Sequence, residues 1–526
     1  MIDDLIESIG HAAGDLSRLP ELIPASERLF DASEAEVSNL LDQLIGLTSG
    51  SSSEDLFHAI NPVILALTNR EQNIESTRSD YQWPEDRLDQ ILKLYRQTPA
   101  ESPLRNALLF WLAPGVQPSR TKSGRFDAWI DLLSNDPPCH RSSIPLAFGP
   151  AMTDQITPDL ESLESLLEKS LQHQQVAPAV FDLLNFYVRN KQVESHPAVK
   201  RADSLSVLLG QLAGQLGKIE EGNISGEVDP QKIGRQVSDS VALIVALCDT
   251  LALIGHEDSI GKLNQAASLK HRRVQTEAAA ALARLGDPFG RQLLRELADE
   301  PVARLRVLNY AEELGIVEEI SLENRGDIAI AESHLAIWLS DPEQMGIAPS
   351  RIKLIDHREM FWPGYENPVH CYLFKYEYGS EENPYTNIAI CGPMTHAFSA
   401  DLTHLEYEDI YALFAGWQTV HEEIYQMHPE RAAETFKEQW QAANAMLNEA
   451  ADWTDIEIKI AAMFFGKLAL VATCVHQTDG RGTAIVDENQ QLFFGEGSAN
   501  APIDFNLAFA IWQGRQLLAT FNPPLP

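Results

Sequence analysis

Three stretches of the chain end in the same way: CDTLALIG at residues 248–255, AAALARLG at residues 279–286 and NYAEELG at residues 309–315. The closing glycines are Gly255, Gly286 and Gly315, so the spacings are 31 and then 29 residues. A nearly fixed period of this length is a signature of structural repeats. The residue before each glycine and the residue four before it are apolar, which places one stripe on one helical face. Glycine is typical of a left-handed C-cap, so each stretch predicts a helix that ends there.

Helices also account for the chain before these repeats. Residues 36–47 and 53–67 each carry apolar side chains at helical spacing, and the double proline at 137–138 ends another helix. Residues 220–229 break the pattern with Gly, Asn and acids, which predicts a loop. No segment before Arg325 alternates like a strand. Helices with short links leave a bundle or a stacked solenoid, and the repeat favours the solenoid.

The segment VQTEAAAALARLGD at residues 274–287 resembles the second helix and turn of a HEAT repeat of the short, phycobilisome-lyase-like kind. The matching positions are Val274, Ala278, Ala279, Ala281, Leu282, Leu285, Gly286 and Asp287. Gln275 stands where the family usually has Arg, and the copy ending at Gly315 is looser. The resemblance implies a right-handed helical stack whose curved face binds another protein. A lyase activity is not implied, because HEAT-like arrays do not by themselves specify an enzyme.

After about Arg325 the sequence pattern changes. Residues 327–340 predict one more amphipathic helix, which either caps the solenoid or begins the next domain. Residues 351–360, 369–378 and 386–391 predict strands, because these segments are rich in β-branched and aromatic residues and are separated by clusters of Pro, Gly and Asn.

Helices are predicted over residues 406–427, 432–450 and 506–518, and a hairpin joins residues 483–487 to 491–495. Residues 464–476 fit either a long strand or a short helix that runs into a strand. The fold class we predict is multidomain: an all-α HEAT-like solenoid followed by an α+β domain. Its parts are an irregular helical array at 1–236, HEAT-like repeats that continue the array at 237–325, and the α+β domain at 326–526.

The chain is strongly acidic, with a formal net charge of −36. This argues against nucleic acid, whose phosphates require clustered Lys and Arg, and against an anionic membrane surface. From Gly326 onward there are 28 acidic and 10 basic residues, so the C-terminal part is the more densely acidic. That charge serves solubility, or it forms an acidic docking face for a basic partner. The N-terminus carries acids where a signal peptide needs basic residues, and no run approaches 18 uncharged apolar residues, so we expect a cytoplasmic protein.

Five cysteines occur singly, at positions 139, 248, 371, 391 and 474, and we expect reduced, mostly buried thiols. Two of them have a histidine nearby, which makes each pair a candidate nucleophile and base: Cys371 with His370, and Cys391 with His396. Adjacent strand residues point to opposite faces, so His370 does not easily serve Cys371. For the second pair, a turn at Gly392-Pro393 would have to bring His396 back. We expect structural thiols and no catalytic residue.

Two groups have ligand types that suit zinc: His396, Asp401, His404 and Glu406, and His421, Glu422 and His428. The histidines lie eight and seven residues apart, whereas the helical zinc motif needs four. A spacing of seven returns to one helical face but separates the two rings by about 10 Å. We therefore expect no metal site and no cofactor.

Two further stretches are candidates for binding. Gly480-Arg481-Gly482 reads as a turn, without the Lys-Ser/Thr or the strand–turn–helix context of a phosphate loop. The aromatic loop at residues 361–365, FWPGY, is either a recognition loop or a lid that folds back on the sheet.

The function we predict is a non-enzymatic scaffold or adaptor that binds a protein partner, with self-association as a further option. The alternative is that the α+β domain is a hydrolase or transferase presented by the solenoid. That alternative requires a concave pocket in which at least two of six side chains converge. The six are His370, Cys391, His396, Asp401, His404 and His421.

Overall fold

The computed structural model describes residues 2–78, 81–113, 124–138, 148–152, 160–171, 176–222, 230–379, 384–488 and 490–522. The chain divides into two compact units, Met1–Leu294 and Arg295–Pro526. Cys139 and most of the loop predicted at 220–229 lie outside the described residues. The limits 1–236, 237–325 and 326–526 remain a prediction, since they follow the sequence pattern and the compact units follow packing.

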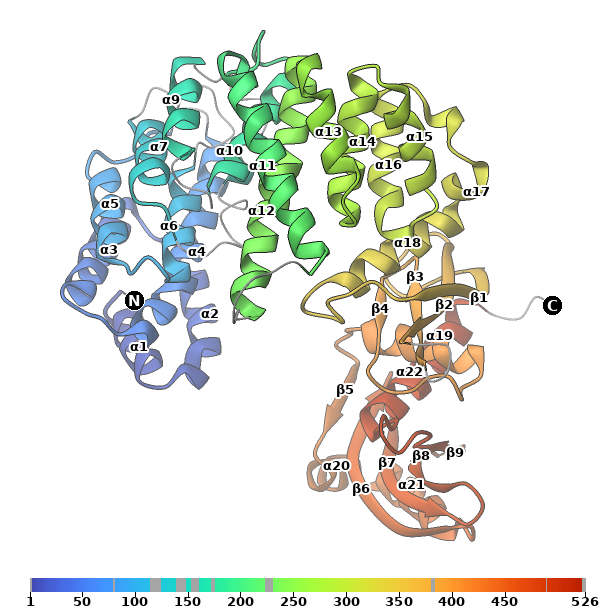
Figure 1. Cartoon of the computed structure of the whole chain (residues 1–526). Helices are drawn as coiled ribbons and strands as arrows, with labels where there is room; N and C mark the ends of the chain where they lie inside the picture. The colour runs from blue at the N-terminus through green and yellow to red at the C-terminus, as the bar shows by residue number, and fades with distance from the viewer. Residues whose placement is uncertain are drawn as a thin grey trace. The chain divides into compact units, whose positions relative to one another are not determined.

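The regular elements described in the first unit are helices (Figure 1). Their bounds are α1 Ile2–Gly14, α2 Leu19–Glu27, α3 Glu34–Thr48, α4 Glu54–Thr77, α5 Arg87–Gln97, α6 Pro103–Leu112, α7 Arg125–Asn135, α9 Leu160–Ser170, α10 Ala177–Arg189, α11 Ala202–Glu220, α12 Pro230–Ile254, α13 Ile260–Ala267, α14 Arg272–Arg284 and α15 Pro288–Leu297, the last of which crosses the limit between the units. Short 3-10 turns lie between several of them. The predicted helical array is confirmed.

Two layers of helices form the repeats. Helices α11 and α13 pack on each other, as do α12 and α14, and each pair is also packed across the layers. The small side chains of α14, a run of alanines, are buried and let the neighbouring helices approach closely.

The three repeat glycines close their helices as predicted. Gly255, Gly286 and Gly315 have φ values of 75°, 84° and 68°. After each glycine the next amide donates across the helix end: His256 N to Leu251 O (3.0 Å), Asp287 N to Leu282 O (2.9 Å) and Ile316 N to Ala311 O (2.8 Å). These are three copies of one Schellman cap, which satisfies carbonyls that the helix leaves unpaired.

The second unit begins with helices and continues with two antiparallel sheets. Its helices are α16 Pro301–Glu313, α17 Leu322–Arg325, α18 Asp327–Ser340, α19 Tyr407–Gln418, α20 Pro429–Thr435, α21 Lys437–Glu449 and α22 Phe505–Phe521. Sheet A has the order β1-β2-β3-β4, with bounds Arg351–Met360, Val369–Tyr378, Tyr385–Cys391 and His396–Ala397. Sheet B has the order β5-β6-β7-β8-β9, with bounds Ile424–Met427, Trp453–Phe464, Lys467–His476, Gly480–Val486 and Gln491–Gly495.

These elements stack in five layers within the unit (Figure 1). Helix α18 covers the outer face of sheet A, α19 and α22 fill the space between the sheets, and α20 and α21 cover the outer face of sheet B. The largest core cluster lies in the middle, where inward side chains of both sheets meet α19 and α22. The predicted combination of an all-α part and an α+β part is confirmed.

The same order of elements occurs twice in this unit. An outer helix, a four-stranded antiparallel meander and an inner helix follow one another as α18, β1–β4, α19 and again as α21, β6–β9, α22. Both inner helices carry Ala and Gly four residues apart, Ala412 and Gly416 in α19, Ala510 and Gly514 in α22. These small residues face each other, so the two helix backbones are in direct contact.

Helix α18 resolves the alternative left open by the sequence, because it takes part in both structures. On one side it packs on α16, and on the other its Ala331, Leu335 and Leu339 pack on sheet A. Its apolar residues therefore surround the helix, as expected for a helix that is covered on two sides.

Several predicted elements need correction. The single helix predicted over 432–450 is divided between α20 and α21. The helix predicted over 406–427 ends at Gln418 and is followed by strand β5. Residues 464–476 contain the last residue of β6 and all of β7, and no helix. The sequence did not predict strand β6. The strands predicted at 351–360, 369–378 and 386–391 and the hairpin of β8 and β9 are confirmed.

Candidate functional site

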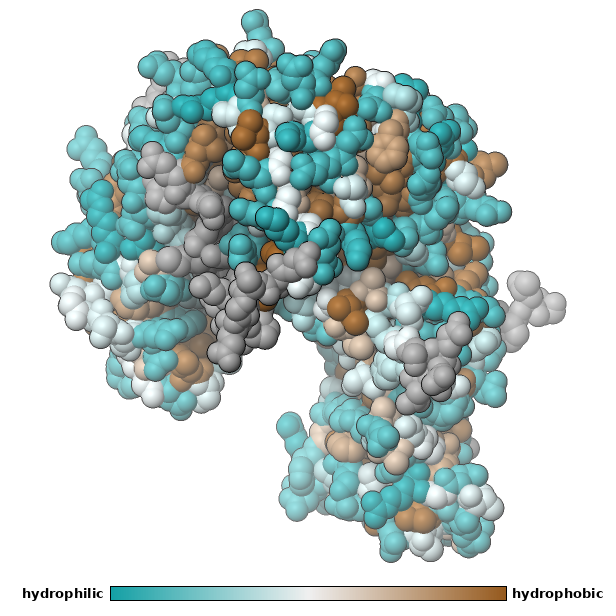
Figure 2. All heavy atoms as spheres, viewed as in Figure 1, coloured by the Kyte–Doolittle hydropathy of each residue, from teal (hydrophilic) through white to brown (hydrophobic). Residues whose placement is uncertain are grey.

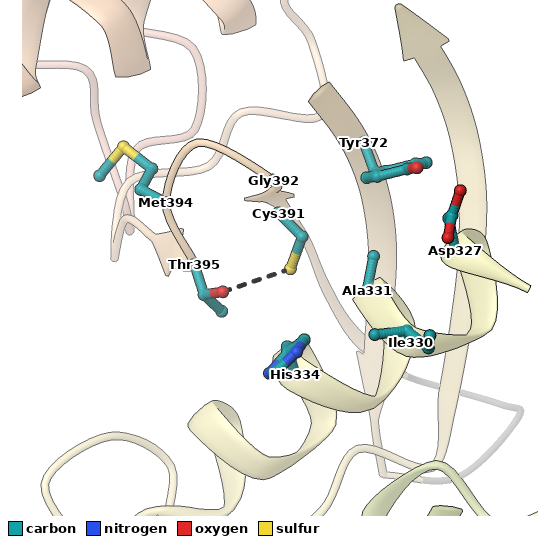
Figure 3. A pocket seen from close by; sticks show the side chains of 9 residues that line it. All are labelled: Asp327, Ile330, Ala331, His334, Tyr372, Cys391, Gly392, Met394 and Thr395. Atoms are coloured by element: carbon teal, nitrogen blue, oxygen red, sulfur yellow. Dashed lines mark hydrogen bonds between the residues drawn. The ribbon is translucent and has the colours of Figure 1, made fainter. Parts of the chain in front are cut away.

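A pocket of about 360 Å³ lies between α18 and the outer face of sheet A. Nine residues line it: Asp327, Ile330, Ala331 and His334 from α18, Tyr372 from β2, Cys391 from the end of β3, and Gly392, Met394 and Thr395 from the turn that leads to β4. In Figure 3, Asp327 and Tyr372 lie on one side of the pocket, and Cys391, Thr395 and His334 on the other.

Local rules place these side chains. The four residues of α18 are spaced i, i+3, i+4 and i+7, which is one helical face. The turn after β3 requires Gly392, whose φ is 118° and whose added Cβ would collide with the carbonyl oxygen of His370. The turn thereby presents Met394 and Thr395 to the pocket.

Burial decides the chemistry of the thiol in this pocket. It raises the pKa of Cys391 to about 12, although the Thr395 hydroxyl, 3.7 Å from the sulfur, acts in the opposite direction. Burial also raises the pKa of Tyr372, and the nearby carboxylate of Asp327 adds to this shift. At neutral pH the pocket therefore contains a thiol and a phenol, not a thiolate.

Two other polar side chains line the pocket, Asp327 and His334. No hydrogen bond or ion pair joins the carboxylate of Asp327 or the ring of His334 to another described residue. The enzyme alternative requires that at least two of six named side chains meet in one pocket. Of these six, only Cys391 lines this pocket.

The first cysteine pair is separated as the strand geometry predicts. Cys371 is fully buried in the core between the sheets, and its pKa is raised to about 12 by burial. His370 points to the other face, where its Nδ1 lies 3.1 Å from Nε2 of His357. The ring of His357 in turn stacks on Tyr372, with centroids 4.5 Å apart.

The second pair is likewise not a nucleophile and a base. His396 lies on β4 opposite Ile390, and its ring stacks on Trp417 at 4.3 Å. Burial lowers the pKa of His396. The hydrogen-bond partner of the Cys391 sulfur is Thr395.

The histidine and acid groups of the sequence have local structural contacts. Asp401 accepts bonds from the amide and hydroxyl of Thr403, and His404 lies against Gly497. His421 accepts from the amide of Glu423 and packs on Phe465, whereas His428 is exposed at the start of α20.

Only one set of three metal-type ligands converges among the described residues, and the sequence did not reveal it. It consists of Asp203, His256 and Asp258, with ligand atoms within 4.8 Å of one another. His256 Nε2 already pairs with Asp203 at 3.0 Å, and that carboxylate is 94% exposed. This contact accounts for the closeness of His256 and Asp203, and the third residue, Asp258, follows His256 by two positions.

The aromatic loop at 361–365 folds back on the second unit. Trp362 is 1% exposed, and its indole Nε1 donates to Gln418 Oε1 at 2.7 Å. Tyr365 donates its hydroxyl to the Pro393 carbonyl, also at 2.7 Å. Gly480, Arg481 and Gly482 begin strand β8, so they are not the turn that was predicted.

The sequence predicted the helix and the strands that form the pocket, but it did not predict the pocket itself. The one signal in the sequence is the spacing of seven between Asp327 and His334, which puts an acid and a histidine on one face of a helix that is rich in apolar residues. That signal does not say which strand the face meets.

Within the described part of the chain, one helical stretch has the length and composition of a membrane span, residues Gln236–Ile254 of α12. Of that stretch, 61% is buried inside the structure, as in the core helix of a soluble protein.

Comparisons with known proteins identify one part of the chain. The family described as HEAT repeats matches residues 236–314. This stretch contains most of α12 and all of α13, α14, α15 and α16. No curated protein and no solved structure matches the chain.

Proposed function

We propose that this chain, whose residues 236–314 are HEAT repeats, is a non-enzymatic scaffold or adaptor that binds another protein through its helical repeat surface. HEAT repeats commonly mediate protein interactions, since stacked helix pairs expose a long continuous surface. The observation that carries the proposal is the family match, together with the three Schellman caps that repeat along the same segment.

The pocket gives less support to the hydrolase or transferase alternative. A thiol whose pKa is about 12 is a poor nucleophile at neutral pH, and no base lies in hydrogen-bond contact with it among the described residues. We therefore place the function in binding.

The charge of the chain favours a basic protein partner. The formal net charge is −36, and the face drawn in Figure 2 is predominantly hydrophilic, with separated hydrophobic residues. A negative field of this size attracts a positive partner and repels nucleic acid and anionic membranes. The proposal accordingly includes a cytoplasmic location, a partner with a basic face, and neither nucleic acid nor membrane.

The test is affinity capture with the full-length protein as bait, using two matched variants. Phe289 lies inside the family match and is 43% exposed, and Phe30 lies outside it and is 45% exposed. Phe289→Asp should weaken retention of the partner by about tenfold or more, because an exposed aromatic residue is a typical anchor of an interface. Phe30→Asp should leave retention unchanged.

Two outcomes contradict the proposal. If no protein is retained by the wild-type bait at moderate salt, the scaffold function is wrong. If Phe30→Asp and Phe289→Asp act alike, recognition does not lie on the repeats. For a basic partner, retention should also fall as salt is raised from about 0.05 to 0.5 M, because salt screens surface charges.

A further inference from the structure

We propose that the pocket between α18 and sheet A binds a small organic cation, an alkylammonium or guanidinium group on a short apolar chain. This inference is independent of the scaffold function, because none of the nine lining residues belongs to the repeats of residues 236–314.

Charge is the first argument. Among the nine lining residues Asp327 carries the only formal charge, and no Lys or Arg is present. Asp327 is an exposed residue that lines the pocket on the same side as Tyr372 (Figure 3), and its carboxylate adds to the burial that raises the pKa of that phenol. No described cation neutralises it. A positively charged group is therefore the ligand that this end of the pocket favours.

Shape and polarity supply the second argument. Ile330 and Ala331 give the pocket an apolar lining near the carboxylate, and Met394 adds an apolar side chain at the opposite end (Figure 3). The volume of about 360 Å³ is at the small end of ligand sites. The hydroxyl of Thr395 and the ring of His334 provide polar contacts away from Asp327 (Figure 3). The lining thus suits a cationic head, a short hydrocarbon body and one polar contact further along.

Asp327 also lies in the first turn of α18, where a negative charge favours the positive end of the helix dipole. This role leaves both carboxylate oxygens without a hydrogen bond from another described residue. An anion, by contrast, would have to approach both that carboxylate and a lining without any Lys or Arg. The helix end therefore does not turn the site into an anion site.

The experiment measures binding to the full-length protein by calorimetry, with four probes of matched length: n-butylamine, n-butylguanidine, n-butanol and butyrate. We expect both cations to bind and the alcohol and the anion to bind at least about twofold more weakly, as an exposed charge contact implies. Nα-acetyl-lysine methylamide is the fifth probe. If this probe binds as tightly as n-butylamine, the pocket accepts the cation of a protein side chain. If it binds more weakly, the pocket is selective for a free amine.

Two variants test the role of the carboxylate. Asp327→Asn removes the charge with little change in size and should reduce n-butylamine binding by about two- to fivefold, as the loss of an exposed charge contact implies. Glu359→Gln removes an exposed carboxylate on β1, outside the pocket, and should leave binding unchanged. Ring NMR signals of His334 in the unmutated protein give a readout that does not depend on how a variant folds, and they should shift on addition of n-butylamine.

The proposal is overturned if n-butanol or butyrate binds as well as n-butylamine, or if Asp327→Asn and Glu359→Gln have equal effects. It is also overturned if saturating n-butylamine leaves the His334 signals in place.

Discussion

Gly514 shows how closely α19 and α22 approach each other. A Cβ built at this position would overlap the carbonyl oxygen of Ala412, and one at Gly416 would overlap that of Ala510. We predict that Gly514→Ala lowers the free energy of unfolding of the second unit by about 3 kcal/mol, because the backbones must move apart. Hydrogen exchange of the amides in α19 and α22 measures this loss.

Gly261 is the matched control for that substitution. It also lies in a helix, but a Cβ added there meets nothing within 4 Å. Gly261→Ala should therefore leave the stability unchanged or raise it by up to about 1 kcal/mol. Equal effects of the two substitutions would refute the steric explanation.

His196 predicts a pH dependence of stability. Burial lowers its pKa from 6.5 to about 4, and its ring is held neutral, with Nδ1 accepting from Ala198 N and Nε2 bonded to Asn185 Oδ1. Between pH 6.5 and about 4 the unfolded chain binds a proton that the folded chain does not. The contribution of His196 to the free energy of unfolding is therefore fully present above pH 6.5. It decreases as the pH falls from 6.5 to about 4, by about 3 kcal/mol in total.

His196→Gln should remove this contribution. We expect the unfolding free energy of the first unit to fall less steeply between pH 7 and 4 in the variant than in the wild type, measured by urea unfolding at a series of pH values. Parallel pH profiles for the two proteins would show that the ring is not held neutral.

Arg304 carries much of the contact between elements α16 and α18. Its side chain is buried, and it donates to the carbonyls of Ala298 (2.9 Å) and Ala329 (2.8 Å) and to the carboxylate of Glu332 (2.7 Å). Arg304→Met keeps the length but leaves these acceptors without their donor. We predict a loss of about 3–5 kcal/mol in the stability of the second unit.

Arg295→Met is the control at this scale, because Arg295 is 50% exposed and its ion pair with Glu319 spans 3.8 Å. Exposed pairs of this kind contribute about 0–1 kcal/mol. Thermal unfolding of both variants measures the difference, and equal shifts would mean that burial of Arg304 is not what matters.

Elements were predictable where the local pattern agrees with the final packing. Strand β2 was predicted with both ends correct, since its two faces meet two different cores and its residues alternate accordingly. Helix α19 was extended too far because Ile424 and Tyr425 continue a helical spacing. The chain leaves the helix at Thr419, whose φ and ψ are −76° and 124°, and Val420 is 97% exposed. Periodicity alone does not report such an exit.

The pocket could not be predicted from the local sequence pattern. Its walls come from residues 327–334 and from residues 372–395, and only the packing of α18 on sheet A brings them together. The burial that raises the pKa of Cys391 has the same origin. The sequence predicted a buried structural thiol at this position, but it did not predict which residues surround the thiol.

At the scale of the whole molecule, the change of sequence pattern near Arg325 and the limit of the compact units differ by about thirty residues. The reason is α18, which completes a helical pair with α16 and also covers a sheet. We predict that a fragment of residues 295–526 is more stable than one of residues 326–526, because the shorter fragment exposes the face of α18 that packs on α16. Thermal unfolding of both fragments measures this, and equal midpoints would place the true limit at Arg325.

The two copies of outer helix, meander and inner helix in the second unit have a further consequence. A chain that carried one copy would expose the small-residue face of its inner helix and could cover it only with a second chain. Such a molecule would assemble at high concentration and come apart on dilution. Because both copies lie on one polypeptide, each finds its counterpart at a high effective concentration that dilution does not change.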